Sequence, residues 1–330
     1  MQQTISLVIP VYAAEAYLMR LCEAIERYRL RLKERGAPVE LTEAIFVIDD
    51  AIDGSSAVLD GLAKQHDWVT TLTLSRNFGQ HSATIAGILH SSGDWVATLD
   101  EDLQHDPGRL SNMFAALLEA DADIAYAKPA AYVHGSVFRD SFSRWYKQAI
   151  AAMTGMDEVV DFNSFRLMRG NIARAASQSA AHQIYFDVAL VWYTTRIAYV
   201  AMDLVDERHQ RTGTSGYSPM KLLAHAKRMA MTSHIRALNY VALAGVAALV
   251  LSFAYLTYIV IVTLLVSNVE PIRGWPSQMV VSLAFGGMTL FVLSFIVEYL
   301  AFLVAKANGR PKFFVIDRSR DEELRSFFLT

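Results

Sequence analysis

Two aspartates separated by one residue, Asp100 and Asp102, are the residues of this sequence best suited to carry chemistry. They follow the apolar run 95–99, whose length and composition predict a buried strand. Two carboxylates at a strand end can jointly hold a divalent cation, Mg²⁺ or Mn²⁺, against a diphosphate. A hydrated acidic turn is the competing interpretation. The preceding strand, and Pro107 at a position that suits the first turn of a helix, favour a binding site.

Polar residues also follow two earlier apolar runs. Asp49 and Asp50 end the run 44–48, where a carboxylate commonly contacts a ribose hydroxyl or a base in nucleotide-binding sheets. A cap on the next helix is the alternative for these two residues. Arg76 follows the run 69–74 and places a cation where a diphosphate could bind. Three successive strand ends therefore carry polar groups.

The elements that would position these groups alternate regularly. We expect strands and helices in turn at 4–9, 17–32, 44–48, 56–66, 69–74, 82–90, 95–99, 108–119 and 124–127. This alternation predicts an α/β domain with a doubly wound, mostly parallel sheet, whose ligand site lies at the carboxyl ends of the strands. A further strand is expected at 162–168, followed by mixed structure.

The composition favours a protein with a membrane portion. Hydrophobic residues make up 53% of the 330 residues and charged residues 19%, and the net charge of −3 gives no sign of a nucleic acid polymer as partner. Residues 238–269 and 274–297 contain no charged side chain, and each run exceeds the roughly 20 residues that cross a bilayer. We expect a hairpin of two transmembrane spans, about 238–266 and 277–304; a helical pair buried in a soluble core is the alternative.

The sequence thus predicts four parts: a catalytic domain at 1–217, an interfacial amphipathic helix at 218–236, the hairpin at 237–305 and a tail at 306–330. An ordinary surface helix is the alternative for the second part. Basic residues flank the hairpin on both outer sides, which predicts that the catalytic domain and both termini are cytoplasmic. We expect multi-pass insertion in the bacterial inner membrane. The single cysteine, Cys22, excludes an intramolecular disulfide.

Four motifs in this order resemble the inverting glycosyltransferases of family 2, within them the dolichyl-phosphate mannose synthase and polyprenyl-phosphate glycosyltransferase branch. They are Val-Ile-Pro-Val-Tyr at 8–12, Val-Ile-Asp-Asp at 47–50, Leu-Ser-Arg-Asn-Phe-Gly-Gln at 74–80, and Leu-Asp-Glu-Asp-Leu-Gln-His-Asp-Pro at 99–107. Later segments at 164–168, 211–218, 298–300 and 309–311 extend the resemblance over nearly the whole chain. It implies a GT-A type catalytic domain.

The resemblance also implies roles for individual residues. Nucleotide-sugar contacts are expected from Pro10, Tyr12, Glu15, Asp49, Asp50 and Arg76. Asp100 and Asp102 would hold the metal, and Gln104 would lie beside the donor sugar. The acceptor phosphate would meet Arg211, Ser215 and, as a second cationic candidate, Arg139; Arg211 is also a catalytic candidate because the family position closes over the donor diphosphate.

The implied reaction is inverting transfer of a sugar from a nucleotide diphosphate sugar to a polyprenyl phosphate, such as undecaprenyl phosphate, at the cytoplasmic membrane face. The implied partners are the donor, the lipid acceptor and the bilayer, with a homo-oligomer as a further candidate. The segment after Asp50 is one residue shorter than the family usually has, and Ala13 replaces a common asparagine. Both UDP and GDP donors therefore stay open.

Three alternatives remain at this point. Another membrane lipid with a hydroxyl group could be the acceptor, in which case Asp161 or Asp187 would serve as base. A processive polysaccharide synthase would carry Gln-x-x-Arg-Trp, but Ser141 stands where that motif has its glutamine. The third alternative is a noncatalytic membrane scaffold that retains the fold.

Overall fold

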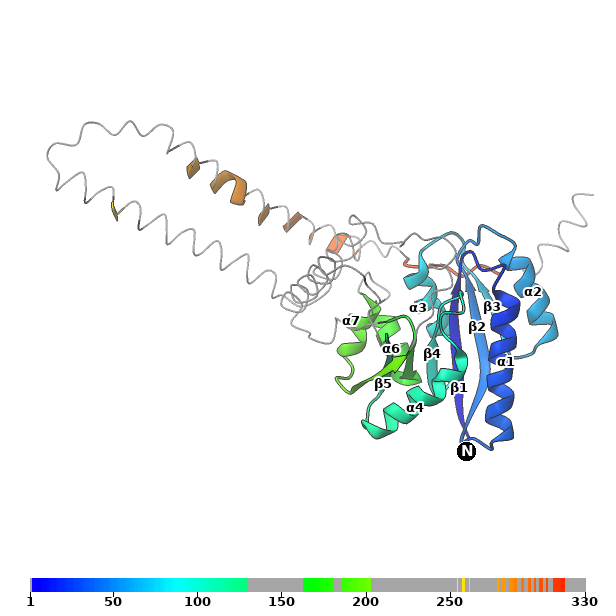
Figure 1. Ribbon diagram of the computed structural model, residues 1–330. Coiled ribbons are helices and arrows are strands. Elements are labelled where there is room, and N and C mark those ends of the chain that lie inside the picture. Colours follow the sequence, from blue (N-terminus) through cyan, green and yellow to red (C-terminus); the bar gives the residue numbers. More distant parts are fainter. Residues whose placement is uncertain are drawn as a thin grey trace, which may run out of the picture. The chain divides into compact units, whose positions relative to one another are not determined.

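The computed structural model describes residues 2–129, 163–180, 185–202 and 311–317, together with isolated helical positions between residues 254 and 307. The chain divides into two compact units, of which the first contains these four ranges and the second contains the isolated positions. All elements named below belong to the first unit (Figure 1).

The first unit is an α/β domain built on one mixed sheet. Its strands are β1 (Gln3–Val11), β2 (Val39–Ile48), β3 (Val69–Thr73), β4 (Trp95–Thr98), β5 (Ile124–Pro129), β6 (Arg166–Arg169) and β7 (Ile197–Met202). Their order across the sheet is β3-β2-β1-β4-β6-β5-β7. Strand β6 runs antiparallel to both neighbours, and the other pairs are parallel. The predicted mostly parallel sheet is therefore confirmed.

Helices cover both faces of this sheet (Figure 1). They are α1 (Leu18–Glu34), α2 (Ser55–Gln65), α3 (Gln80–His90), α4 (Leu110–Glu119), α6 (Gly170–Ala180) and α7 (Phe186–Val191), with a 3₁₀ turn η1 at Pro107–Arg109. Side chains of α1, α2 and α4 pack on one face, and those of α3, α6 and α7 pack on the other. Two cores are expected when the strands of a parallel sheet are buried on both faces.

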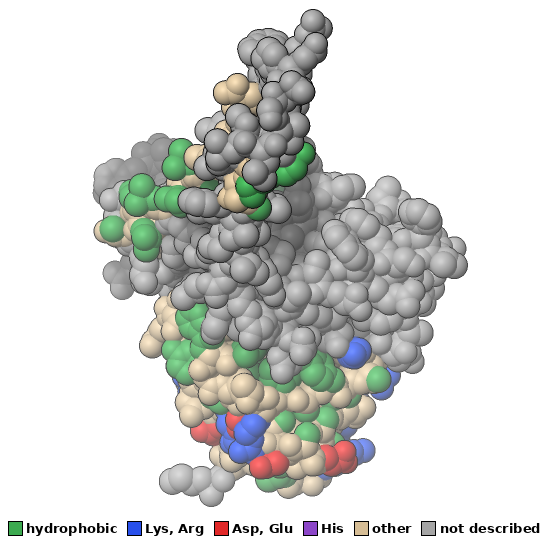
Figure 2. Space-filling view, turned by 90° about the vertical axis from the view of Figure 1, so that its left-hand side faces the viewer, with side chains coloured by type: hydrophobic (Ala, Val, Ile, Leu, Met, Phe, Trp, Pro, Cys, Tyr) green, Lys and Arg blue, Asp and Glu red, His purple; other side chains and the backbone are tan. Residues whose placement is uncertain are grey.

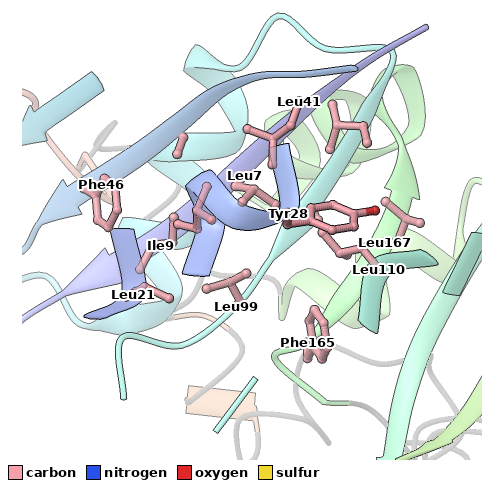
Figure 3. Close-up of a cluster of buried hydrophobic side chains, with 14 of the residues drawn as sticks. Leu7, Ile9, Leu21, Tyr28, Leu41, Phe46, Leu99, Leu110, Phe165 and Leu167 are labelled. Carbon is pink, nitrogen blue, oxygen red and sulfur yellow. The ribbon is translucent and has the colours of Figure 1, made fainter. Parts of the chain in front are cut away.

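Side chains alternate in direction along β1, so successive residues pack into opposite cores. Leu7 and Ile9 face the core beneath α1, where Leu21 and Tyr28 pack around them (Figure 3). Val8 faces the opposite core. The apolar residues of α1 recur at helical spacing, so that one stripe of the helix is buried and the rest is solvent-exposed.

One glycine allows α3 to pack closely against the sheet. A Cβ at Gly87 would lie 2.4 Å from Cγ1 of Val8 and 2.9 Å from Cγ2 of Val47. Both valines belong to buried strands, so neither can move aside easily. Gly87 thereby fixes how near the helix lies to β1 and β2.

Residues 311–317 return to the sheet at its β3 edge. Leu74 and Val315 form an antiparallel bridge there. These residues fall within the predicted tail 306–330, and their pairing with the sheet is a feature that sequence patterns did not indicate.

Most other expectations for the first 129 residues agree with the structure. The expected strand at 162–168 is β6, shifted towards its carboxyl end, and the region expected to be mixed contains α6, α7 and β7. The described part of the chain contains no helix long and apolar enough to cross a membrane. Positions 203–253, and most of the predicted hairpin, lie outside the described residues. The four-part division therefore stays a prediction.

The surface of the described unit carries charges of both signs. On the face shown in Figure 2, acidic and basic side chains lie next to one another and form no broad surface of one charge. Ion pairs join Arg196 to Asp121 and, at 2.7 Å, Arg169 to Asp123.

Candidate functional site

A cavity of about 360 Å³ opens at the carboxyl ends of β1, β2 and β4, beside the start of α3. Its lining consists of Pro10, Val11, Tyr12, Asp49, Asn77, Gly79, Gln80, Asp100, Glu101 and Asp102. The location agrees with the rule that ligands of doubly wound sheets bind outside the carboxyl ends of the strands. The predicted site at this edge of the sheet is therefore present as a cavity, hereafter the strand-end pocket.

Asp100 is held by hydrogen bonds at both carboxylate oxygens. The Gln80 side-chain amide donates to Oδ1 at 2.6 Å, and the Ser164 hydroxyl donates to Oδ2 at 2.6 Å. Gln80 begins α3, whereas Ser164 precedes β6, so the two donors come from distant parts of the sequence. Their bonds fix the direction in which the Asp100 carboxylate faces the pocket.

The other two acidic residues of the triplet have different surroundings. Glu101 turns towards the end of β1, where its carboxylate accepts the backbone N–H of Tyr12 at 2.8 Å and that of Ala13 at 3.4 Å. Asp102 is largely buried, and its Oδ1 accepts the backbone N–H of Gln104 at 3.2 Å. Glu101 thus ties the loops after β1 and β4 together.

Asp49 supports the loop 75–79 from within the pocket. Its two carboxylate oxygens accept the backbone N–H groups of Phe78 and Gly79, each at 2.7 Å. Gly79 has φ of 90°, a left-handed conformation that favours glycine. Burial raises the pKa of Asp49, the two backbone N–H groups lower it, and the neighbouring charge of Asp50 raises it; the net direction is upward.

His105 lies behind the paired aspartates. It is buried and stacks on Phe165 with ring centroids 4.9 Å apart, and its Nδ1 accepts the backbone N–H of Asp100 at 3.2 Å. Burial lowers the pKa of His105, against the opposing charges of Asp100 and Asp102. The imidazole is therefore neutral near pH 7 and supports the loop as a hydrogen-bond acceptor.

A buried polar network continues from Ser164 into the domain. The Thr98 hydroxyl donates to the Ser164 carbonyl at 2.5 Å and accepts from Nε of Arg166 at 2.9 Å. Arg166 forms an ion pair with Asp187, which also accepts a 2.8 Å bond from the hydroxyl of Tyr126. Burial opposes the charge of Arg166, but the contact with Asp187 outweighs it and raises the pKa of the guanidinium.

This network includes Asp187, one of the two residues that the sequence offered as a base for a hydroxyl acceptor. Asp187 is 3% exposed, is paired with Arg166 and does not line the strand-end pocket. In the folded domain Asp187 compensates a buried cation, and these contacts give no support to its use as a base for a hydroxyl acceptor. Asp161, the other candidate base, lies outside the described residues.

The structure brings together part of the predicted site. Pro10, Tyr12, Asp49, Asp100 and Asp102 line the strand-end pocket. Strand-end position had indicated the three aspartates, and the family resemblance had indicated Pro10 and Tyr12. Glu15, Asp50, Arg76 and Gln104 are not among its lining residues. Arg139, Arg211 and Ser215 lie outside the described residues, so their assignment to the acceptor phosphate stays a prediction.

Two of the residues outside the lining have contacts of their own. The Glu15 carboxylate accepts the backbone N–H of Gly54 at 2.9 Å, and a Cβ at Gly54 would lie 2.7 Å from that carboxylate. Arg76 is exposed, with its guanidinium 4.2 Å above the ring of Phe78. Both side chains adjoin the loops that carry the pocket.

Sequence reasoning did not select Asn77, Gln80 or Glu101 as binding residues, although all three line the pocket. Their position in the sequence could have indicated them as lining residues, because each belongs to a motif that directly follows a strand. Ser164 was also missed, since its bond to Asp100 joins residues 64 apart in the sequence.

The acidic residues fit a divalent cation that the substrate helps to bind. Within the described residues, no group of three or more His, Cys, Asp or Glu side chains is arranged to hold a metal ion. Mg²⁺ is commonly bound by one or two carboxylates together with water and substrate phosphates. Asp100 and Asp102 on one pocket wall provide such a pair.

The model of the family described as "Glycosyl transferase family 2" matches residues 6–175, which include every residue that lines the strand-end pocket. The chain belongs to this family. The predictions of a family 2 glycosyltransferase and of an α/β fold with a mostly parallel sheet are thereby confirmed.

Family 2 relatives align with the chain over nearly its full length. The bactoprenol glucosyl transferase of Shigella phage SfII is 26% identical over 317 residues, which are 94% of this chain and 97% of the relative. The uncharacterized glycosyltransferase sll0501 of Synechocystis is 27% identical over 314 residues, 95% of each chain.

Solved structures with a similar fold are more distant. Glucosyl-3-phosphoglycerate synthase from Mycobacterium tuberculosis, in complex with Mn²⁺, UDP and phosphoglyceric acid, has a TM-score of 0.46 and 16% identity, covering 70% of this chain and 77% of the other. S. aureus TarS 1–349 in complex with UDP-GlcNAc has a TM-score of 0.44 and 13% identity, covering 72% and 69%.

Proposed function

We propose that this glycosyltransferase transfers a sugar from a nucleotide diphosphate sugar to a polyprenyl phosphate at the cytoplasmic face of a membrane. The observation that carries the proposal is the strand-end pocket with Asp100 and Asp102 on its wall, in a family 2 chain. Relatives called bactoprenol glucosyl transferase, which align over 94% of the chain, support a polyprenyl phosphate as acceptor and glucose as one candidate sugar.

The donor would bind with its nucleoside near the ends of β1 and β2 and its diphosphate near the end of β4. Pro10, Tyr12 and Asp49 line the first region, and Asp100 and Asp102 line the second. A Mg²⁺ or Mn²⁺ ion held by the two aspartates would supply positive charge next to the leaving diphosphate. UDP is the first donor to test, and GDP is the second.

The acceptor phosphate would attack the anomeric carbon of the sugar. A bond forms between a phosphate oxygen and that carbon while the bond to the diphosphate oxygen breaks, and the nucleoside diphosphate leaves with the electron pair. Attack from the opposite side inverts the anomeric configuration. Because a phosphate is already anionic near pH 7, the reaction needs no strongly tuned base.

A hydroxyl acceptor would need such a base. Asp187 is buried against Arg166, so the described residues give that alternative no support from this side chain. The phosphate acceptor agrees better with a pocket in which catalysis depends on placement and charge. Arg211, Arg139 and Ser215 are the proposed contacts of the acceptor phosphate.

We further propose that the chain is anchored in the bacterial inner membrane by the hairpin 237–305, with the helix 218–236 in the headgroup layer. The uncharged runs 238–269 and 274–297 support this topology. A polyprenyl tail stays in the bilayer, so an anchor would keep the pocket near the acceptor phosphate. The catalytic domain and both termini would then be cytoplasmic.

The test uses membranes that contain the full-length protein, polyprenyl phosphate and labelled UDP- or GDP-sugars. Label entering the organic phase is measured with Mg²⁺, with Mn²⁺ and with a chelator. We expect metal-dependent transfer that Asp102→Asn abolishes while the circular dichroism spectrum is unchanged. Asp60→Asn, which changes an exposed carboxylate on α2, is the matched control and should retain activity.

The outcomes separate the parts of the proposal. No transfer from any donor by folded protein would contradict the polyprenyl phosphate acceptor. Full activity of Asp102→Asn, or transfer in the presence of chelator, would contradict the metal assignment.

A further inference from the structure

The segment 311–317 pairs with residues 73–75 at the carboxyl end of β3, the outermost strand at one end of the sheet. The Ser75 backbone N–H donates to the Phe314 carbonyl at 2.9 Å, and the Ile316 N–H donates to the Thr73 carbonyl at 2.9 Å. These bonds lie on either side of the bridge between Leu74 and Val315. The segment therefore satisfies the Thr73 carbonyl and the Ser75 N–H, two backbone groups that a sheet edge would otherwise expose.

Side chains also attach the segment to the domain. Phe313 and Val315 pack against the core beneath α3, whereas the intervening Phe314 is 58% exposed. The Lys312 ammonium donates to the Ala180 carbonyl at 2.7 Å, at the end of α6. This alternation of packed and exposed side chains is that of a strand with one buried face.

The pairing ends where the loop 75–79 begins. Ser75 is bonded to Phe314, and the other end of the loop is held by Asp49 through Phe78 and Gly79. The loop is therefore anchored at both ends, once by the segment and once by the strand-end pocket itself.

The same loop leads directly into the pocket. Asn77 and Gly79 line it, and Gln80, the next residue, donates to Asp100. Backbone bonds at Ser75 and side-chain bonds at Gln80 are thus only five residues apart along the chain. A displacement at Ser75 would reach Asn77 and Gln80 through a short, otherwise fixed segment.

We infer that residues 311–317 are a positioning segment for the loop 75–79 beside the strand-end pocket, so that the sequence following the second predicted span helps to build the proposed donor site. The identity of the ligand as a nucleotide rests on the proposed function. The segment touches no reacting atom; it acts through Ser75 and Leu74. Loss of its pairing should weaken nucleotide binding without removing any residue that lines the pocket.

The experiment compares full-length detergent-solubilised variants. Ile316→Pro removes the N–H that bonds to Thr73, and Val315→Asp places a charge against the core beneath α3. Lys312→Met removes one side-chain bond and is the mildest change. Phe314→Ala is the matched control, because it shortens an exposed side chain and keeps the carbonyl that Ser75 uses.

Two readouts are measured on each variant that retains the circular dichroism spectrum of the wild type. The first is amide hydrogen exchange of a peptide covering 74–80, and the second is the Kd for UDP and for GDP. In Ile316→Pro and Val315→Asp we expect faster exchange and about tenfold weaker binding, the scale of one lost hydrogen bond. Lys312→Met should show a smaller change in the same direction, and Phe314→Ala should match the wild type.

Each outcome bears on the inference. Faster exchange with unchanged nucleotide affinity would overturn the positioning role, and unchanged exchange would overturn the anchoring of the loop. If the folded wild type binds neither UDP nor GDP, the proposed donor is contradicted. The exchange data then decide by themselves whether the segment holds the loop.

Discussion

A 2.6 Å hydrogen bond from the Gln80 side-chain amide to Oδ1 of Asp100 connects the start of α3 to the end of β4. Gln80 begins α3, the helix that follows β3, and Asp100 follows β4. In the sheet, β2 and β1 lie between β3 and β4. Ser164 holds the other oxygen of the same carboxylate at 2.6 Å. The direction of Asp100 therefore depends on two side chains from separate parts of the fold.

Removing these donors should lower turnover through the orientation of Asp100. For Gln80→Ala and for Ser164→Ala we expect about tenfold lower kcat in the transfer assay and a higher Mn²⁺ concentration for half-maximal activity. The double variant should lose less than the product of the single effects, because both donors act on one carboxylate. Gln65→Ala, at an exposed position of α2, is the control. Wild-type metal dependence in both single variants would contradict this role.

Two glycines on helices should respond oppositely to alanine. A Cβ at Gly87 would lie 2.4 Å from Val8, so we expect Gly87→Ala to reduce the free energy of unfolding by about 1–3 kcal/mol. Gly61 on α2 has nothing within 4 Å of such a Cβ, so Gly61→Ala should increase that free energy by about 0.5–1 kcal/mol. Denaturant unfolding measures both changes, and equal effects of the same sign would contradict the packing described for α3.

The buried pair Arg166 and Asp187 should be sensitive to loss of one partner. Asp187→Asn leaves a guanidinium that is 5% exposed without its counter-charge, and we expect the free energy of unfolding to fall by about 3–5 kcal/mol. Variants that fold at low temperature should retain sugar transfer, because Asp187 does not line the strand-end pocket. Complete inactivity of folded Asp187→Asn would return this residue to consideration as a base.

Asp123 should make stability depend on pH in the acid range. Burial opposes its charge, but hydrogen bonds from Thr194 and Arg169 and the charges of Arg169 and Arg196 prevail and lower the pKa of its carboxyl. The folded state thus favours the ionised form, and the resulting stability is present above the ordinary aspartate pKa. It is lost as the pH falls through the lower folded-state pKa.

We therefore expect Asp123→Asn to be less stable than the wild type at pH 7 and to differ less from it as the pH falls below about 4. Thermal unfolding between pH 3 and pH 7 measures this difference. Asp67→Asn, at an exposed position, is the control. A stability difference that stays constant with pH would contradict the assignment.

Much of the fold and part of the site were predictable because local patterns specify them. Apolar runs and helical spacing identified β1 to β5 and the helices between them, and the polar residues that end those strands meet at one edge of a parallel sheet. Strand β6 was located, but its antiparallel direction depends on a return of the chain that no local pattern encodes.

Contacts between distant residues explain what sequence patterns missed or misassigned. Asp187 resembled a free carboxylate in the sequence, yet folding places it against Arg166, 21 residues away. The Glu15 carboxylate bonds to the backbone of Gly54, a contact that sequence patterns missed, and its expected contact with the nucleotide stays a prediction. Ser164 lies in a segment that resembles the family, but nothing in the sequence indicated that its hydroxyl would bond to Asp100.

The sequence by itself determined the α/β class and the edge of the sheet where Asp49, Asp100 and Asp102 would meet, because periodicity and strand-end position are local properties. Its motifs indicated the family. Only the tertiary structure decided which partner each carboxylate has and that residues 311–317 pair with the chain at the end of β3. Those features depend on side chains and backbone groups far apart in the chain, whose distances are set only when the sheet and both helical layers pack together.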